Sequence, residues 1–104
     1  MAKMVKRHVK FGKDEVVRRG WLMIFSGPAR SGKSSESRKL RDDPNEHPFE
    51  VVEGNGDPIS VQIMLTYLDR GIDVIYETTL GVSHLPKILL DNARTIEIFR
   101  RDDE

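Results

Sequence analysis

The sequence predicts an α/β protein with a small, mostly parallel sheet of four to five strands and helices on both faces. Short apolar runs alternate along the chain with segments of helical periodicity, which is the pattern that parallel sheets produce. Glycines, prolines and helix-capping residues mark the boundaries between these segments. The 104 residues suffice for one domain with its own core.

The first predicted strand is the apolar run Trp21–Phe25, whose continuity is expected of a strand covered on both faces. A short helix from Lys33 to about Leu40 should follow, and it should end before Pro44, because proline disfavours helix at the preceding residue. This helix is polar, so we expect it to pack weakly on the sheet unless its small side chains permit a close approach. Phe49–Glu53 is the second predicted strand.

The second predicted helix has the clearest boundaries. Asp57 can cap its N-terminus, Pro58 suits the first turn and Gly71 can close the C-terminus. Five residues between these ends recur at helical spacing and are expected to form one buried face: Ile59, Ile63, Met64, Tyr67 and Leu68.

A third strand, Ile72–Tyr76, and a fourth, Thr95–Phe99, complete the expected sheet. Between them Ser83 is expected to cap a third helix that tolerates Pro86 in its first turn. Three residues of this helix are expected to face inward: Leu85, Ile88 and Leu89.

Directly after the first strand, residues 27–34 read Gly-Pro-Ala-Arg-Ser-Gly-Lys-Ser, which fits the phosphate-binding pattern G-x-x-x-x-G-K-S. The glycines let backbone amides turn around a polyphosphate, and the helix start adds unpaired amides and the positive end of its dipole. Nine residues are therefore expected to bind a nucleotide: Gly27, Pro28, Ala29, Arg30, Ser31, Gly32, Lys33, Ser34 and Ser35.

The side chains of this segment have distinct expected roles. Lys33 places a positive charge on the terminal phosphates, and Ser34 offers its hydroxyl to Mg²⁺. Ser35 supplies a second hydroxyl within reach of an α-phosphate. Arg30 either adds charge near the phosphates or lies in solvent, and the sequence favours neither.

Carboxylates follow the second and third predicted strands. Glu77 can hold a Mg²⁺-bound water or orient a nucleophile, or else cap the turn at Thr78 and Thr79. Asp57 can be a general base for an acceptor hydroxyl or only a helix cap, with Glu53 as a nearby substitute for the base. Ligands of parallel sheets bind beyond the carboxyl ends of the strands, so these groups should gather at one edge.

Composition limits the function classes. The chain has no cysteine, which excludes disulfides and thiolate metal sites and favours a reducing, cytoplasmic location. No apolar run is long enough for a membrane span, and no apolar signal core follows the basic N-terminus. The three histidines, His8, His47 and His84, lack metal-ligand spacing and are expected at the surface, while Trp21 and Tyr67 are expected in the core.

The charges are segregated, although the formal net charge is zero. Residues 1–19 hold seven Lys or Arg and two acids, whereas residues 42–57 hold six acids and no Lys or Arg. Residues 1–20 therefore form either a basic arm, which can bind nucleic acid or an acidic protein or simply lie in solvent, or an added strand. The domain proper is expected over 21–104.

These residues resemble P-loop kinases of the nucleotide-kinase type. Residues 73–80, Asp-Val-Ile-Tyr-Glu-Thr-Thr-Leu, are similar to the strand ending in Glu-Thr-Thr of zeta-toxin-like kinases and relatives of polynucleotide kinase. The resemblance covers about residues 21–100 and implies a three-layer P-loop fold, ATP or GTP as the nucleotide, and Mg²⁺. It implies phosphate and metal binding by Lys33, Ser34 and Ser35, a metal or substrate role for Glu77, and a looser match of Asp57 to the base.

Kinases of this type continue past the fourth strand into an arginine-bearing lid helix and a further strand, whereas this sequence stops at Glu104. An arginine on the transferring phosphoryl group can be worth several powers of ten in rate, and Arg100 and Arg101 are the candidates to replace it.

Two function classes follow from these observations. The first is a minimal kinase-like phosphotransferase that moves the γ-phosphate of ATP to a small-molecule or nucleotide acceptor. The second is a non-catalytic P-loop module that regulates or inhibits a macromolecular partner. A weaker alternative is a role at nucleic-acid ends, which would require steeply salt-dependent binding.

Overall fold

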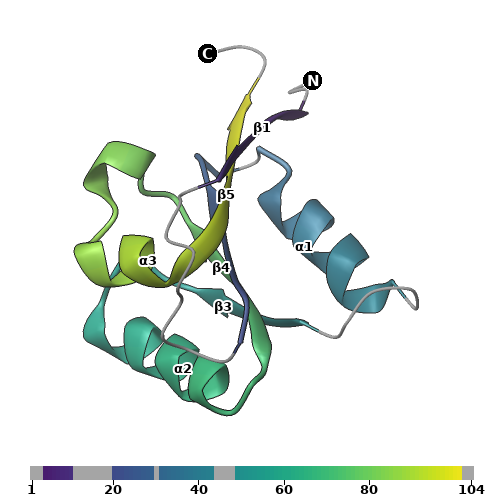
Figure 1. Ribbon diagram of the computed structural model, residues 1–104. Helices are drawn as coiled ribbons and strands as arrows, with labels where there is room; N and C mark the ends of the chain where they lie inside the picture. The colour runs from purple at the N-terminus through teal and green to yellow at the C-terminus, as the bar shows by residue number, and fades with distance from the viewer. Residues whose placement is uncertain (1–3, 11–19, 30, 44–48, 102–104) are drawn as a thin grey trace.

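The computed structural model describes residues 4–10, 20–29, 31–43 and 49–101 (Figure 1). In chain order its elements are β1 (Met4–Lys10), β2 (Leu22–Ser26), α1 (Lys33–Asp42), β3 (Phe49–Glu53), α2 (Pro58–Asp69), β4 (Asp73–Thr78), the 3₁₀ turn η1 (Val82–His84), α3 (Lys87–Asn92) and β5 (Ala93–Arg101). The alternation of strand and helix that the sequence predicts is confirmed, and the protein is of the α/β class.

The strands form one sheet in the order β1-β5-β2-β4-β3. The four strands β5, β2, β4 and β3 run parallel, and β1 pairs antiparallel with β5 at the edge. Because β2 lies between β4 and β5, the loop that leaves its carboxyl end emerges in the middle of the sheet edge. This position is the one where parallel sheets bind ligands.

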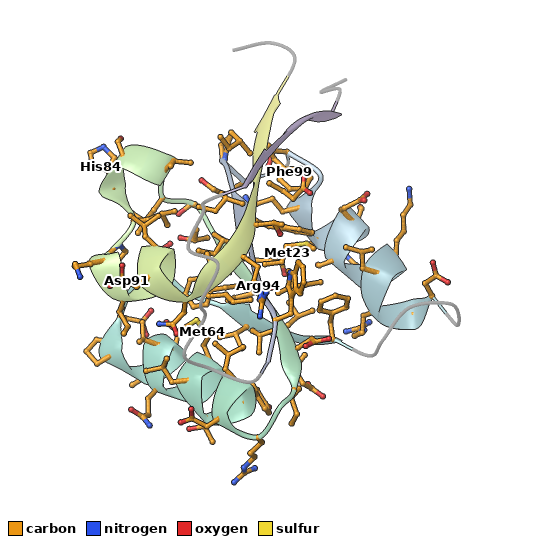
Figure 2. All side chains as sticks on the ribbon, viewed as in Figure 1. Met23, Met64, His84, Asp91, Arg94 and Phe99 are labelled. Atoms are coloured by element: carbon orange, nitrogen blue, oxygen red, sulfur yellow. The ribbon has the colours of Figure 1, made fainter. Side chains whose placement is uncertain are left out.

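The helices cover both faces of the sheet, α2 and α3 on one side and α1 on the other (Figure 1). The larger core lies under α2 and α3, where Met64 and Leu68 pack against residues such as Tyr76. Figure 2 shows Met64 between α2 and the sheet, and Phe99 on the side of α1. On that side Phe25, Ile75 and Phe99 form a smaller core, with Leu40 of α1 packed against it.

The buried residues of α1 are Lys33 and the small Ser37, and Leu40 packs beside them against the smaller core. Ser37 is fully buried, and its hydroxyl donates to the Ser34 carbonyl at 3.1 Å. The helix extends to Asp42, about two residues beyond the prediction, and Asp43 is extended. That conformation is the one expected of a residue before proline, although Pro44 itself lies outside the described residues.

The predicted apolar face of α2 is partly wrong. Ile59 is 74% exposed and Ile63 is 44% exposed, whereas the fully inward positions are Ser60, Met64 and Leu68. These three residues are four apart and share one stripe of the helix. Met64 and Leu68 bury this stripe in the larger core. Ser60 can share it because its hydroxyl forms a 2.7 Å hydrogen bond with the buried Tyr76 hydroxyl, a polar contact that apolar periodicity does not detect.

The prediction for the third helix is also wrong at its start. Ser83 lies in η1, and α3 begins only at Lys87, after the extended residues Leu85 and Pro86. The residue before a proline avoids helical geometry, so Pro86 separates two short elements instead of sitting in the first turn of one helix. Leu85 and Leu89 are buried as predicted, but Ile88 is exposed.

Trp21 is not a core residue. It is 41% exposed, and the Arg94 guanidinium lies over its ring at 4.9 Å from the ring centre. Its backbone amide donates to Asp73 Oδ1 at 2.8 Å, which ties the start of β2 to the start of β4. Tyr67, by contrast, packs against the larger core as predicted.

Candidate functional site

The glycine-rich loop is fixed to the sheet edge at its first residue. The Gly27 amide donates to the Thr78 carbonyl at 3.1 Å. A Cβ at Gly27 would lie 2.2 Å from the Phe99 carbonyl oxygen, so no side chain fits there. Gly32, the residue before α1, has a φ of 93°, which favours glycine. Both glycines of the motif are therefore required by the path of the chain.

The Lys33 ammonium lies against its own loop. Its Nζ donates to the carbonyls of Gly27 and Pro28, and the Ser31 hydroxyl donates to the same Pro28 carbonyl at 2.7 Å. Burial lowers the pKa of Lys33, while the negative charge of Glu77 acts in the opposite direction. An anion entering the loop would compete with these two carbonyls for the ammonium.

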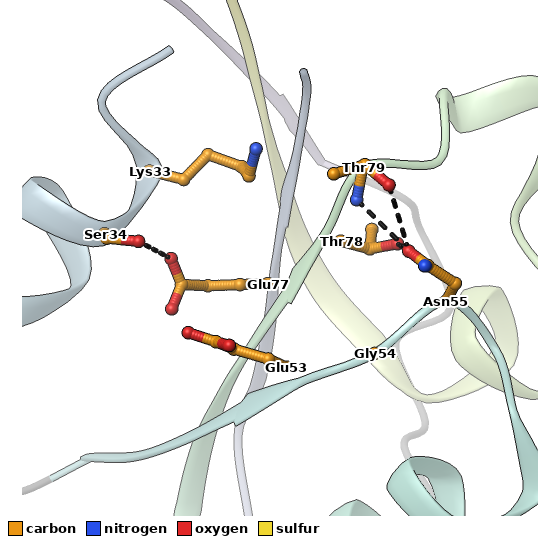
Figure 3. A pocket seen from close by; sticks show the side chains of 8 residues that line it. All are labelled: Lys33, Ser34, Glu53, Gly54, Asn55, Glu77, Thr78 and Thr79. Carbon is orange, nitrogen blue, oxygen red and sulfur yellow. Dashed lines mark hydrogen bonds between the residues drawn. The ribbon is translucent and has the colours of Figure 1, made fainter. Parts of the chain in front are cut away.

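Glu77 faces the loop from the end of β4. It is only 6% exposed, and its Oε1 accepts a hydrogen bond of 3.1 Å from the Ser34 hydroxyl (Figure 3). Glu53, at the end of β3, is paired directly with Glu77 in the parallel register. A serine hydroxyl and two carboxylates are oxygen ligands of the kind that Mg²⁺ takes, so the donor set of Ser34, Glu53 and Glu77 fits this ion.

Asn55 closes the other side of the site. Its Oδ1 accepts from the Thr78 and Thr79 hydroxyls, each at 3.1 Å, and from the Thr79 amide at 3.4 Å (Figure 3). The neighbouring Gly54 amide donates to the Glu77 carbonyl at 3.1 Å. These bonds join the loop after β3 to the end of β4. Asn55 was not among the predicted site residues, and its one signal in the sequence is its place between two glycines after a strand.

Asp57 is the N-cap of α2. Its carboxylate accepts from the Ser60 amide at 3.0 Å, the Ser60 hydroxyl at 2.8 Å and the Asn55 amide at 3.2 Å. These bonds, the Ser60 amide first among them, lower the pKa of Asp57 to about 2. The structure therefore favours the capping role that the sequence offered as the alternative to a general base.

One cavity brings most of these groups together, and we call it the main cavity. It has a volume of about 400 Å³. Its lining residues are Lys33, Ser34, Glu53, Gly54, Asn55, Glu77, Thr78 and Thr79. Neither Asp57 nor Ser35 lines it; Ser35 is exposed on the outer side of α1. Arg30 and His47 lie outside the described residues, and His84 is exposed.

Metal binding at the main cavity would need oxygen atoms from outside the protein. Within the described residues, no group of three or more His, Cys, Asp or Glu side chains could hold a metal ion by itself. Mg²⁺ commonly keeps several waters and binds substrate phosphates together with one or two carboxylates. The pair Glu53 and Glu77 matches that requirement.

Comparisons with known proteins add no assignment. No protein-family model matches the sequence, and no curated protein is significantly similar to it. Within the described part of the chain, no helix has the length and apolar character that crossing a bilayer requires.

Proposed function

We propose that this protein is a nucleotide-binding P-loop protein that transfers the γ-phosphate of ATP or GTP to a small-molecule or nucleotide acceptor. The observation that carries this proposal is the convergence of Lys33, Ser34, Glu53 and Glu77 on one cavity at the carboxyl ends of parallel strands. Helix α1 on one face of the sheet and α2 with α3 on the other support a three-layer P-loop arrangement.

The residues of the loop would hold the nucleotide phosphates. Lys33 would exchange its bonds to the Gly27 and Pro28 carbonyls for the β- and γ-phosphates, where a positive charge is most useful. Ser34 and Glu77 would hold Mg²⁺ directly or through water, so that the Glu53 carboxylate remains available for proton transfer. When bound, Mg²⁺ neutralises charge that develops on the phosphate oxygens.

Glu53 is better placed than Asp57 to be the general base, because it lines the main cavity and Asp57 does not. The acceptor hydroxyl oxygen would bond to the γ-phosphorus as the bond from that phosphorus to the β,γ-bridging oxygen breaks. Glu53 would take the hydroxyl proton, and the products would be the nucleoside diphosphate and the phosphorylated acceptor.

Calorimetric titration with Mg-ATP and Mg-GTP tests the proposal. We expect saturable binding of one of them by the wild type and at least about tenfold weaker binding by Lys33→Ala, since charge-assisted contacts to phosphate are strong. Lys39→Ala is the matched control, because Lys39 is an exposed lysine of the same helix outside the main cavity. Equal binding by wild type and Lys33→Ala, or no binding of either nucleotide, would contradict the proposal.

A second candidate function is a binding module with little turnover. No arginine of the described residues lines the main cavity, and an arginine on the transferring phosphoryl group has a large effect on rate. Nucleotide binding without acceptor-dependent formation of ADP or GDP would favour this module. Its macromolecular partner, protein or nucleic acid, would then be sought at the basic residues 1–19.

A further inference from the structure

A second cavity of about 510 Å³, which we call the side cavity, lies between α1 and β3. Four residues of α1 line it at helical positions i, i+3, i+4 and i+7, which form one stripe of the helix: Ser34, Ser37, Arg38 and Arg41. The opposite wall contains Val51 and Glu53, which are two apart on β3 and point to the same face of the sheet.

The side cavity has opposite charges at its two ends. At one end it shares Ser34, Glu53 and Glu77 with the main cavity. Toward the C-terminal end of α1 it is lined by Arg38 and Arg41, which lie about 6 Å and about 10 Å along the helix axis from Ser34. A ligand in this space would meet carboxylates at one end and guanidinium groups at the other.

The two arginines are suitably placed for an anion. Arg38 Nε donates to the Ser34 carbonyl at 3.3 Å, which orients the guanidinium plane. Arg41 pairs with its neighbour Asp42 at 3.2 Å, and both side chains are exposed, so this ion pair contributes little and exchanges easily. Planar guanidinium donors match the geometry of phosphate oxygens and can bind them in pairs.

We infer that the side cavity is the acceptor subsite and that it takes a small phosphate monoester with a free hydroxyl. Arg38 and Arg41 bind the phosphate, and the hydroxyl reaches toward Glu53 and the main cavity. The separation of roughly 6–10 Å between the arginines and Ser34 along α1 suits a sugar phosphate or a nucleoside monophosphate. The orientation of the hydroxyl rests on the proposed phosphotransfer, whereas the binding of the phosphate does not.

Calorimetry with ribose 5-phosphate, AMP and ribose tests this inference on the whole chain. We expect both phosphate esters to bind saturably and ribose, which lacks the anion, not to bind. Arg38→Gln and Arg41→Gln should each weaken binding about tenfold or more, because charge-assisted hydrogen bonds to phosphate are lost. Lys39→Gln, which removes the same charge from the same helix outside the side cavity, should change binding less than about twofold.

Lys33→Ala separates this inference from the proposed function. Binding of ribose 5-phosphate that persists in Lys33→Ala, while nucleotide binding is lost, would support both proposals. If nucleotide binds but the esters do not, or if Lys39→Gln weakens their binding as much as Arg38→Gln, the acceptor subsite is refuted and the nucleotide site stands. If the esters bind and no nucleotide does, the phosphate site stands and the proposed function fails.

The same titrations distinguish a nucleoside monophosphate from a sugar phosphate as the ligand of the side cavity. Tighter binding of AMP than of ribose 5-phosphate would indicate a nucleoside monophosphate, and equal affinities would indicate a sugar phosphate. A 5′-phosphorylated oligonucleotide that binds more tightly than both esters, with steep salt dependence, would overturn the assignment to a small molecule. Since Arg38 and Arg41 are exposed, the glutamine variants are expected to fold, which circular dichroism verifies.

Discussion

Two interactions shift the pKa of Lys33 in opposite directions, and the resulting pKa can be measured. Burial lowers its pKa, and the carboxylate of Glu77 raises it. A lysine whose pKa is lower in the folded state binds fewer protons there than in the unfolded state. The free energy of unfolding therefore rises with pH from the folded pKa up to about 10.4, the pKa of an unfolded lysine.

Glu77→Gln should lower the pKa of Lys33 further, because the substitution removes the charge that favours the ammonium. Glu53→Gln, at the paired position on β3, should have a smaller effect, since Glu53 is not a cause of the shift. An NMR titration of the Lys33 Cε resonance measures both. An unchanged or raised pKa in Glu77→Gln would show that the two side chains do not interact as described.

Asp57 should stabilise the fold as an N-cap. Asp57→Ala is expected to lower the melting temperature by roughly 5 °C, and Asp57→Asn by much less, because asparagine also caps helices well. The pKa of about 2 in the folded state lies below the ordinary value. The stabilisation is therefore present above pH ~4 and is lost as the pH falls toward 2.

Melting curves between pH 2 and 7 check this prediction. The melting temperature of the wild type should fall to that of Asp57→Ala as the pH drops from about 4 to about 2. Asp57→Asn should remain more stable than Asp57→Ala over the same range. If Asp57→Asn is as stable as the wild type but loses acceptor-dependent turnover, the general base is Asp57 and not Glu53.

Gly54 has no room for a side chain. A Cβ there would lie 2.2 Å from Ser60 Oγ and 2.5 Å from the Tyr76 hydroxyl. Gly54→Ala should destabilise the protein by about 1–3 kcal/mol, as overpacking does. Gly81→Ala is the control: its Cβ would meet only His84, at 3.9 Å. Urea unfolding of both variants measures the difference, and equal stabilities would refute the close packing around Gly54.

At the scale of elements, the orientation of α2 is the feature most open to test. Met64→Ala should cost about 2–5 kcal/mol, since Met64 is fully buried in the larger core. Ile59→Ala should stay within about 0.5 kcal/mol, because Ile59 is mostly exposed. Denaturant unfolding distinguishes the two, and a larger effect at Ile59 would mean that the predicted face was right after all.

The limits of prediction from sequence are visible in these elements. The presence of four strands and of the first two helices followed from apolar runs, caps and glycines. The burial of Ser60 on the inner side of α2 did not, because it depends on a hydrogen bond to Tyr76 of another element. The predicted start of α3 is wrong because a proline such as Pro86 suits a first helical turn but also forces the residue before it, Leu85, to be extended.

The residues of the candidate site were likewise only partly predictable from the sequence. Lys33, Ser34 and Glu77 were predictable, since motif spacing and strand ends place them at one edge. That Glu53 lines the main cavity and Asp57 does not depends on strand register, which pairs Glu53 with Glu77. Asn55 required knowing that the turn after β3 lies beside the end of β4. Relations between separate strands cannot be obtained from local spacing.

At the scale of the whole molecule, β1 forms one edge of the sheet, so that β5 is an interior strand. It pairs with β5 along seven residues, from Met4 opposite Arg101 to Lys10 opposite Thr95. A further strand could therefore pair only beyond β1 or beyond β3. This arrangement protects β5, whose open edge would otherwise invite pairing with another chain.

Removal of residues 1–10 should expose β5. We expect faster hydrogen exchange of β5 amides, a lower melting temperature and concentration-dependent self-association, because unpaired strand edges pair with one another. Exchange mass spectrometry and light scattering measure these effects. Exchange and melting equal to those of the full chain would show that β1 contributes nothing to the sheet.

The two cavities have a common wall made of Ser34, Glu53 and Glu77. Any pair of ligands that occupies both must therefore interact through these three side chains, and the first to arrive alters the affinity for the second. Thermodynamic linkage makes that effect reciprocal. The coupling is favourable if a bound cation neutralises the carboxylates and unfavourable if the negative charges of the two ligands repel each other. Its sign would determine whether both cavities fill together or whether one ligand excludes the other.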